Sequence, residues 1–582
     1  MSQIYLHQSH HTLADFSSIS QYLKQSFSEE GLHLFPELFL TGYPLQDLCL
    51  QRPFIKAYQK HLSDIETWAK SLSASWSSRA LMGGLAYEMD EAGLPLKITN
   101  VMYEVIPGKG LKILYTKRLL PNYDIFDEEK YFTAGHENAY YQFDSKTYGL
   151  LICEDMWHSS IHLTDPCREM KTDCDSKKLK LDGVINLSAS PFDIDKIERR
   201  LKRGKELSHL FEAPFIYVNR VGGEDEVLFD GSSFIVLAEE ILLQGKPFIP
   251  EILKWNHQDS KAKFKSPTLA YENTWEGLFT PRLDYSQKPI ELKPWSDQQC
   301  ELILKALCFG LQEYAAKSGF NHFLVALSGG IDSALVLALV KLALKPGQTV
   351  EAIYMPSVHS SSTSTQLADE MCRRVGIKMQ FLPIKFFHSS VKNAFTQTFE
   401  EPFTGLTDEN IQSRLRGTLL YTRSNQTGAM VINTSNKSEL AVGYSTQYGD
   451  SVGAISMLGD LFKTEVYRLS EYLNKHHGNL IPDGIIERGP SAELRDNQLD
   501  QDSLPPYKRL DAMLEGILSY RLDAEDLAQQ GFSEEEIRKV FSLYVKSEYK
   551  RKQFCPIIKT KTKSFGFGHR VPISKSLKFY QQ

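Results

Sequence analysis

A glycine-rich loop after a short apolar run constrains the fold of this chain more than any other feature. Residues 328–333 read Ser-Gly-Gly-Ile-Asp-Ser and directly follow the apolar run 323–327, which predicts a buried strand. The apolar run 334–339 then predicts a helix. Because the glycines let the backbone turn sharply beside the start of that helix, loop amides and the helix N-terminus can surround an anion. The order strand, loop, helix therefore predicts a phosphate-binding loop in a parallel α/β sheet.

The side chains of this loop indicate what kind of phosphate site it forms. The loop lacks the Gly-Lys-Ser/Thr ending of nucleoside triphosphatase loops. Asp332 instead places a carboxylate where it can hold Mg²⁺ against phosphate oxygens, and Ser328 and Ser333 offer hydroxyl groups. An ordinary Gly-Gly turn between a strand and a helix is the alternative.

The length of 582 residues predicts at least two domains. In the first part, apolar runs and helical patterns predict a mixed α/β fold, and the polar stretch near 255–290 predicts a connecting segment. In the second part, strands alternate with long helices, which predicts a doubly wound parallel sheet with its ligand at the carboxyl ends of the strands. The expected strands are 32–36, 149–153, 182–187, 214–219, 232–237, 323–327, 350–355 and 429–433; the expected helices include 51–72, 194–211 and 298–317; the expected domains are 1–250 and 291–582, joined by the connecting segment 251–290.

Charge and cysteine content argue against several classes of protein. The net charge of −6 gives no general attraction to nucleic acid. The first residues lack the basic and apolar regions of a secretory signal, and the longest apolar stretches are interrupted, so we expect no membrane span. The eight cysteines are scattered without Cys-x-x-Cys pairs, which argues against a zinc site or a disulfide framework and predicts a cytoplasmic protein.

Three apolar runs in the first part each end in a reactive side chain. These side chains are Glu37, Lys117 and Cys153. A cysteine nucleophile needs a base for its proton and a cation for the developing negative charge, and Glu37 and Lys117 can fill these roles. The alternatives are a packed core cysteine, a solvated lysine and a Pro-Glu turn.

The motifs around these residues resemble the nitrilase superfamily. The matching stretches are Phe-Pro-Glu-Leu at 35–38, Lys-Arg-Leu-Leu-Pro-Asn-Tyr at 117–123 and Ile-Cys-Glu-Asp-Met-Trp at 152–157. The resemblance implies an α-β-β-α sandwich that hydrolyses carbon–nitrogen bonds through a thioester, with Glu37, Lys117 and Cys153 as its catalytic triad. The stretches 188–192, 217–225 and 229–233 further resemble the glutaminase domain of the glutamine-dependent NAD⁺ synthetase family, although Ser188 stands where that family usually has Asn. By this resemblance the glutamine-binding residues are Tyr123, Ser190 and Lys196.

The second part resembles the ATP pyrophosphatases and the synthetase domain of the same family. The matching stretches are 409–416, 434–439, 443–450, 459–464, 490–495, 500–507 and 548–553. Each stretch also has an alternative interpretation when it is taken singly. Arg414 and Arg416 could form a solvated helix face, residues 436–439 could be a helix cap, and residues 548–552 could be a charged stretch on the surface. The resemblance implies that Lys463 faces phosphates and that Asp332 and Glu439 hold Mg²⁺. It implies that ATP contacts Ala326, Leu327, Ser328, Gly329, Gly330, Ile331, Asp332, Ser333 and Thr434, and that the dinucleotide substrate contacts Asn410, Glu439, Tyr444, Ser445, Thr446, Gln447 and Lys550.

Together the two parts imply ATP-dependent amidation of deamido-NAD⁺ to NAD⁺, with ammonia from glutamine. The resemblance also implies a homo-oligomer and small-molecule substrates. Another glutamine-dependent amidotransferase is the alternative enzyme, although the nitrilase-type triad disfavours it. A dinucleotide-binding sensor without turnover is the alternative from another class, and the intact Glu37, Lys117, Cys153, Ser328 and Asp332 argue against it.

Overall fold

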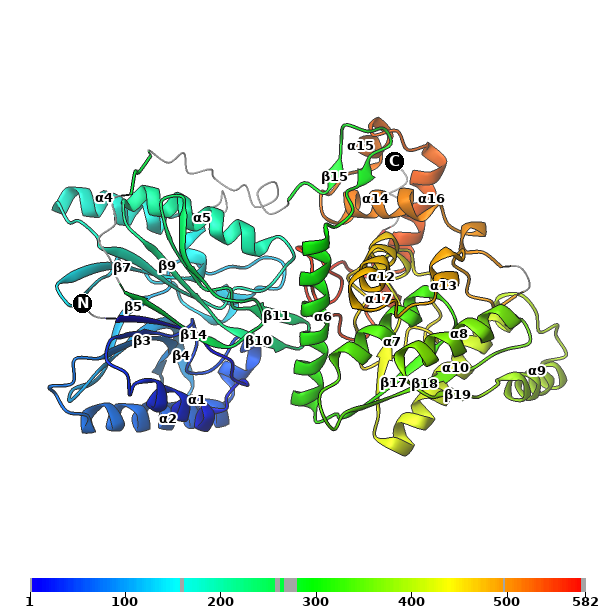
Figure 1. Ribbon diagram of the computed structural model, residues 1–582, viewed down its shortest axis with the longest axis horizontal. Coiled ribbons are helices and arrows are strands. Elements are labelled where there is room, and N and C mark those ends of the chain that lie inside the picture. The colour runs from blue at the N-terminus through cyan, green and yellow to red at the C-terminus, as the bar shows by residue number, and fades with distance from the viewer. Residues whose placement is uncertain (1–2, 158–161, 257–261, 266–279, 496–497, 577–582) are drawn as a thin grey trace. The chain divides into compact units, whose positions relative to one another are not determined.

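The structure is a computed structural model that describes residues 3–157, 162–256, 262–265, 280–495 and 498–576. The chain divides into two compact units, residues 1–278 and 279–582, each of which is described by itself (Figure 1). No helix in the described ranges has the length and apolar character needed to cross a bilayer.

Two six-stranded sheets form the centre of the first unit. Each sheet mixes parallel central pairs with antiparallel edges, as in the parallel pairs β1–β2 and β7–β8 and the antiparallel pairs β1–β14 and β6–β7. One sheet has the order β14 (Glu251–Asn256), β1 (Gln3–Gln8), β2 (Leu32–Leu34), β3 (Arg79–Met89), β4 (Pro95–Ile106) and β5 (Gly110–Thr116); the other has β13 (Glu240–Gln244), β12 (Phe234–Leu237), β9 (Phe215–Asn219), β8 (Gly183–Ser188), β7 (Lys146–Ile152) and β6 (Tyr140–Phe143).

Helices cover the outer face of each sheet, which makes four layers (Figure 1). The helices α1 (Phe16–Ser26) and α2 (Arg52–Ser71) pack on the first sheet, and α4 (Pro166–Lys177) and α5 (Lys196–Phe211) pack on the second. A separate apolar core lies between the sheets and includes Leu34 and Leu150. The strands β7 and β8 are buried on both faces along most of their length, so the apolar residues 150–152 and 184–185 follow one another instead of alternating with polar ones. The expected α-β-β-α sandwich is therefore confirmed.

A five-stranded parallel sheet forms the centre of the second unit. Its order is β19 (Met379–Phe381), β18 (Thr349–Tyr354), β17 (His322–Leu327), β20 (Met430–Asn433) and β21 (Ile455–Ser456). The chain leaves the central strand β17 first to one side and later to the other, so the sheet has a topological switch point beside β17, where ligands of such sheets bind. The expected doubly wound parallel sheet is confirmed. Its main helices are α6 (Asp297–Ser318), α7 (Ile331–Ala343), α8 (Ser362–Val375), α10 (Leu406–Thr427) and α12 (Lys463–His477).

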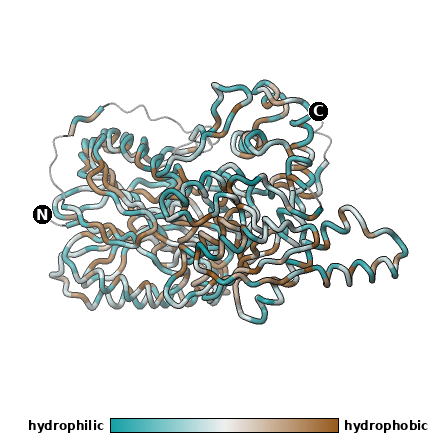
Figure 2. Tube along the Cα trace, turned by 45° about the vertical axis from the view of Figure 1, so that its right-hand side comes forward, coloured by the Kyte–Doolittle hydropathy of each residue, from teal (hydrophilic) through white to brown (hydrophobic). Residues whose placement is uncertain are grey.

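The C-terminal part of the second unit is a smaller helical cluster with its own apolar core. Its main helices are α14 (Tyr507–Leu518), α15 (Ala524–Gln529), α16 (Glu534–Lys546) and α17 (Glu548–Arg551). In Figure 2 brown segments run through the interior strands, while surface helices alternate between brown and teal along their length. The helix α9 (Lys385–Phe399) differs from the other helices in its exposed aromatic residues, because the side chains of Phe386, Phe395 and Phe399 are largely exposed to solvent.

The structure corrects part of the expected secondary structure. Within the expected connecting segment 251–290, Glu251–Asn256 forms β14 and pairs with β1, and Leu283–Asp284 forms β15, which pairs with β16 (Glu291–Leu292). Residues 257–261 and 266–279 of that segment lie outside the described residues. β14 was not predicted because its sequence alternates polar and apolar residues at the edge of the sheet. The boundaries between the domains stay a prediction.

Candidate active sites

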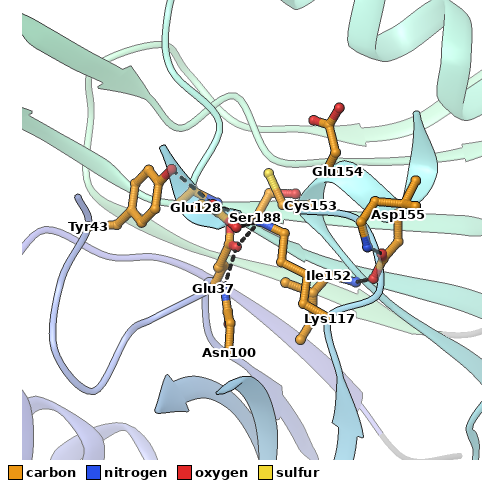
Figure 3. Close-up of polar contacts among 12 residues, drawn as sticks. Glu37, Tyr43, Asn100, Lys117, Glu128, Ile152, Cys153, Glu154, Asp155 and Ser188 are labelled. Carbon is orange, nitrogen blue, oxygen red and sulfur yellow. Dashed lines mark hydrogen bonds and ion pairs between the residues drawn. The ribbon is translucent and has the colours of Figure 1, made fainter. Parts of the chain in front are cut away.

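The three residues expected to form a nucleophilic site lie together in the first unit. Glu37 follows β2, Lys117 follows β5, and Cys153 begins the short 3₁₀ helix η2 (Cys153–Met156) after β7. The Lys117 Nζ donates to Glu37 Oε1 at 2.7 Å, and Cys153 lies beside this pair (Figure 3). All three side chains are buried. The packing of the two sheets therefore brings together residues that are far apart in the sequence.

A fourth residue of this cluster, Glu128, was missed by the sequence analysis. Glu128 begins the short helix α3 (Glu128–Tyr131), and its carboxylate accepts a hydrogen bond from Lys117 Nζ at 2.8 Å and one from the Tyr43 hydroxyl at 2.9 Å. Burial raises the pKa of Glu128 to about 7, although the Lys117 ammonium opposes the shift. In the sequence this residue looks like part of a solvated acidic run, and no local pattern distinguishes it.

The surroundings of Lys117 and Cys153 set their protonation states. Burial alone would lower the pKa of Lys117, but the carboxylates of Glu128 and Glu37 outweigh burial and raise it well above its usual value. Burial also raises the pKa of the Cys153 thiol well above its usual value, and the nearby Glu37 carboxylate adds to this effect. Cys153 is therefore a neutral thiol at rest and needs a base before it can attack.

Glu37 is held in the position that such a base requires. Its Oε1 accepts from Asn100 Nδ2 at 2.8 Å in addition to Lys117, and its Oε2 accepts from the Ala189 backbone N–H at 2.8 Å. These donors come from β4 and from the loop after β8. The carboxylate is thus fixed by both sheets, beside the thiol.

The backbone of Cys153 has a conformation that non-glycine residues rarely adopt. Its φ is +46°, which lies in the left-handed region. Asn186, on β8, supports this conformation: its Oδ1 accepts from the Cys153 N–H at 2.6 Å, and its Nδ2 donates to the Cys153 carbonyl at 3.3 Å. Such backbone strain persists only where several neighbouring groups hold the residue in place, and it is often found at functional residues.

Two of the predicted glutamine-binding residues, Tyr123 and Lys196, lie near a further carboxylate, Glu154. The Tyr123 hydroxyl donates to Glu154 Oε1 at 3.0 Å. Burial raises the pKa of Glu154 to about 8, and the Lys196 ammonium is the strongest opposing group. Burial lowers the pKa of Lys196 to about 8, and its Nζ lies 4.7 Å from the centre of the Trp157 ring. Glu154 therefore joins the predicted residues as one that the sequence analysis left without a role.

Ser190, the third predicted glutamine-binding residue, is held by a network of its own. Its N–H donates to Asn219 Oδ1 at 2.8 Å, and its Oγ and carbonyl accept from the buried Arg200 at 3.2 and 2.8 Å. Arg200 in turn donates to both carboxylate oxygens of Asp230. The roles of Asn219, Arg200 and Asp230 in holding Ser190 were not predicted from the sequence.

The second candidate site is a cavity of about 250 Å³ at the switch point of the parallel sheet. The loop 326–333 and the start of α7 line it. Gly329 has a φ of +82°, and a Cβ there would lie 2.6 Å from the Ser364 carbonyl oxygen, so the loop requires glycine at this position. All nine residues expected to contact ATP line this cavity, together with Glu439 and Tyr444.

Asp332 lines this cavity and contacts two polar side chains. It accepts a hydrogen bond from Asn436 Nδ2 at 2.9 Å and forms a close ion pair with Lys463. Lys463 Nζ is also 3.4 Å from Glu439 Oε1, so one cation contacts both carboxylates that the sequence analysis assigned to Mg²⁺. Burial and the Asp332 carboxylate raise the pKa of Glu439, and Lys463 opposes this shift.

Five residues expected to contact the dinucleotide do not line the cavity. Thr446 Oγ1 donates to Asn410 Oδ1 at 2.8 Å, and Lys550 Nζ donates to the Gly443 and Ser445 carbonyls at 2.7 and 2.6 Å. Ser445, Thr446 and Gln447 lie in the loop that follows α11 (Lys437–Val442), and Asn410 on α10 and Lys550 on α17 hydrogen-bond to this loop. The five residues are Asn410, Ser445, Thr446, Gln447 and Lys550.

Some residues that line the cavity were not predicted from the sequence, or were interpreted as surface residues. Arg416 lines the cavity, with its Nε donating to the Met355 carbonyl at 2.9 Å, whereas Arg414 is exposed as the alternative reading supposed. Arg488 and Glu493 also line the cavity and form an ion pair of 2.6 Å. Arg416 faces inward because helix α10 packs beside the sheet, which a helical pattern alone does not show.

Comparisons with known proteins find relatives that match nearly the whole chain. The family model "NAD synthase" matches residues 303–554. The glutamine-dependent NAD(+) synthetase of Acinetobacter baylyi is 35% identical over 552 residues, which cover 93% of this chain and 92% of that protein. The glutamine-dependent NAD(+) synthetase of Thermotoga maritima is 33% identical, with 94% of this chain and 93% of that protein covered.

Solved structures show the same similarity over the whole chain. The glutamine-dependent NAD⁺ synthetase of Acinetobacter baumannii, solved in complex with ADP, has a TM-score of 0.68 and 29% identity and covers 98% of each chain. The glutamine-dependent NAD(+) synthetase of Cytophaga hutchinsonii has a TM-score of 0.74 at 19% identity, covers 99% of this chain and 98% of that chain, and supports the fold alone. From the two sites and the whole-length similarity, we conclude that this chain belongs to the glutamine-dependent NAD⁺ synthetase family.

Proposed function

We propose that this chain makes NAD⁺ from deamido-NAD⁺, ATP and glutamine, and releases AMP, pyrophosphate and glutamate. The observation that carries the proposal is the presence on one chain of two different sites. One is the buried cluster of Glu37, Lys117 and Cys153, and the other is the glycine-loop cavity around Asp332. An amidase that releases ammonia and a site that activates a carboxylate together make an amidating ligase.

In the first unit, Cys153 attacks the side-chain amide of glutamine. Glu37 takes the thiol proton and returns it to the leaving ammonia, and Lys117 stabilises the negative charge on the tetrahedral oxygen. Water then hydrolyses the thioester to glutamate. Glu154 and Lys196, whose pKa values both lie near 8, can hydrogen-bond the amino and carboxylate groups of glutamine, beside the hydroxyls of Tyr123 and Ser190.

In the second unit, the loop 326–333 binds the phosphates of ATP while the substrate carboxylate is adenylated. Ammonia then attacks the adenylate, and AMP leaves. The loop amides, the N-terminus of α7 and Lys463 supply the positive groups that face the phosphates. Five further residues remain proposed dinucleotide contacts: Ser445, Thr446 and Gln447 in the loop after α11, and Asn410 and Lys550, which hydrogen-bond to that loop.

The carboxylates of Asp332 and Glu439 fit a Mg²⁺ ion. Both already contact one cation, the Lys463 ammonium. Two carboxylates suffice, since Mg²⁺ usually takes one or two from the protein and completes its shell with phosphate oxygens and water. When bound, the ion would neutralise phosphate charge during adenylation.

The exposed aromatic face of α9 supports a homo-oligomer. Phe395 and Phe399 lie one turn apart on this helix, are 48% and 60% exposed, and have ring centres 5.3 Å apart, so they form one exposed apolar surface. We infer that a second copy of the chain covers this face. The cysteine pattern supports a reducing cytoplasm as the location.

Measuring NAD⁺ formation with glutamine or ammonium as the nitrogen donor tests the proposed function. The wild-type protein should use both donors. The variant Cys153→Ala should lose glutamine use and keep ammonium use, whereas Cys174→Ala, which removes a buried thiol on α4, should keep both. Glutamate release without NAD⁺ formation would point to another amidotransferase, and dinucleotide binding without any turnover would point to a sensor.

A further inference from the structure

Asp155 is a buried carboxylate for which the reaction outlined above has no role. It lies in η2, is 1% exposed and accepts four hydrogen bonds. Its Oδ2 accepts from the Ile152 N–H at 3.0 Å and from the Tyr115 hydroxyl at 2.8 Å. Its Oδ1 accepts from the backbone N–H groups of Arg118 and Leu119 at 3.0 and 2.8 Å. Asp155 therefore uses both of its oxygens within the protein.

The four donors come from two separate segments, one on each sheet. Three of them lie on the segment 115–119, which carries Lys117 at the end of β5. The fourth, Ile152, ends β7 and directly precedes Cys153. In Figure 3 the Asp155 carboxylate lies against the backbone of Ile152. One side chain thus ties the segment of the cation to the segment of the nucleophile.

Local capping explains only one of these four bonds. A carboxylate in the first turn of η2 can accept the Ile152 N–H whether or not the site has a function. The other three bonds reach the opposite sheet, so they do not stabilise η2 itself.

The backbone strain at Cys153 also indicates a functional role for Asp155. The left-handed φ of +46° needs support from both sides of the residue. Asn186 holds the Cys153 N–H and carbonyl from β8, and Asp155 holds the preceding N–H. Without Asp155, one of these two supports is lost.

We propose that Asp155 is a positioning residue for glutamine hydrolysis, which holds Lys117 and Cys153 at their working separation. The inference rests on the proposed glutaminase function. Asp155 acts through the two segments and touches no substrate. A small misplacement of reacting groups can lower a rate by about a hundredfold without weakening binding.

The variant Asp155→Asn tests this role. Asparagine keeps one oxygen for two of the donors, but its amide group places N–H groups against the other two. We expect kcat for glutamine hydrolysis to fall by about 10- to 100-fold, with KM for glutamine within about threefold of wild type. Alkylation of Cys153 by iodoacetamide, followed by peptide mass mapping, should slow in parallel. NAD⁺ formation from ammonium should stay at the wild-type rate, because it uses the second unit, and the circular dichroism and thermal unfolding of the full chain report whether the first unit is folded.

A matched control is Asp182→Asn. Asp182 accepts the Thr147 N–H at 2.8 Å at the opposite end of β7, so the same substitution there should leave kcat unchanged. If Asp155→Asn fails to fold, Tyr115→Phe tests the same role, because it removes only one of the four hydrogen-bond donors to Asp155. We expect kcat of this variant for glutamine hydrolysis to fall severalfold at constant KM. A wild-type kcat in these variants, or a change confined to KM, would overturn the inference. An inactive wild-type glutaminase would instead overturn the proposed function.

Discussion

Replacing Glu128 with Gln probes how charge is balanced around Lys117. The Lys117 ammonium is completely buried between two carboxylates, Glu37 at 2.7 Å and Glu128 at 2.8 Å. Gln keeps the size of the side chain and one hydrogen-bond acceptor but removes one negative charge. The variant therefore separates the charge of Glu128 from its shape.

The size of the effect follows from the hydrogen bond that changes. A hydrogen bond between charged groups contributes about 1.5–3 kcal/mol, and a neutral one about 0.5–1.5 kcal/mol, so the loss is about 1–2 kcal/mol. If this difference appears in the transition state, kcat for glutamine hydrolysis falls by about 5- to 30-fold. Synthesis from ammonium does not use this site and should not change.

The pH dependence gives a sharper test. Because the pKa of Glu128 is raised to about 7, the wild-type carboxylate takes up a proton as the pH falls through 7 and then resembles Gln. The wild-type rate should exceed that of Glu128→Gln at pH 8, and the ratio of the two rates should approach one near pH 5. Both rates should be measured as glutamate release at saturating glutamine.

The exposed neighbour Glu129 provides the matched control. It lies next to Glu128 on α3, and its contact is with Asn122 rather than with Lys117. Glu129→Gln should keep the wild-type rate at every pH. A ratio between wild type and Glu128→Gln that stays constant from pH 8 to pH 5 would show that ionisation of Glu128 has no part in catalysis.

Three further predictions concern other parts of the chain. Asp332→Asn should lower NAD⁺ formation about a hundredfold with either nitrogen donor while glutamate release continues; normal AMP and pyrophosphate release would remove Asp332 from the mechanism. Burial holds the pKa of His7 well below its usual value, so His7 takes up a proton on unfolding when the pH is below about 6.5. The free energy of unfolding should therefore decrease as the pH falls below that value, by up to about 1.4 kcal/mol per pH unit. His7→Gln should lessen this pH dependence in urea unfolding, and an unchanged pH dependence would refute the assignment. Phe395→Ser with Phe399→Ser should lower the mass measured by light scattering, and an unchanged mass would exclude the α9 face as the contact.

Much of the fold followed from residues whose pattern is local. The loop 328–333 indicated the parallel sheet of the second unit because strand, glycine turn and helix are adjacent in the chain. Glu37, Lys117 and Cys153 were recognisable because each ends an apolar run beside a distinctive motif. The long strands β3 and β4 were missed, since their ends are polar and extend beyond the buried centre of the sheet.

Residues that matter through distant contacts could not be found in this way. Glu128 lies in an acidic stretch that is typical of a solvated surface, and only the packing of α3 against the Lys117 segment buries it. Asp155 was visible as part of a motif, but its four hydrogen bonds join residues from both sheets. Sequence spacing carries no information about such links between the layers.

The left-handed backbone at Cys153 has a consequence for the evolution of this site. A non-glycine residue in this region costs about 1–2 kcal/mol relative to an ordinary conformation, and a folded domain is stable by only about 5–15 kcal/mol. Glycine would remove this strain, but it would also remove the nucleophile. Selection for stability and selection for glutaminase activity therefore favour different residues at position 153, and a lineage that no longer needed glutamine as its nitrogen donor would be free to accumulate glycine there.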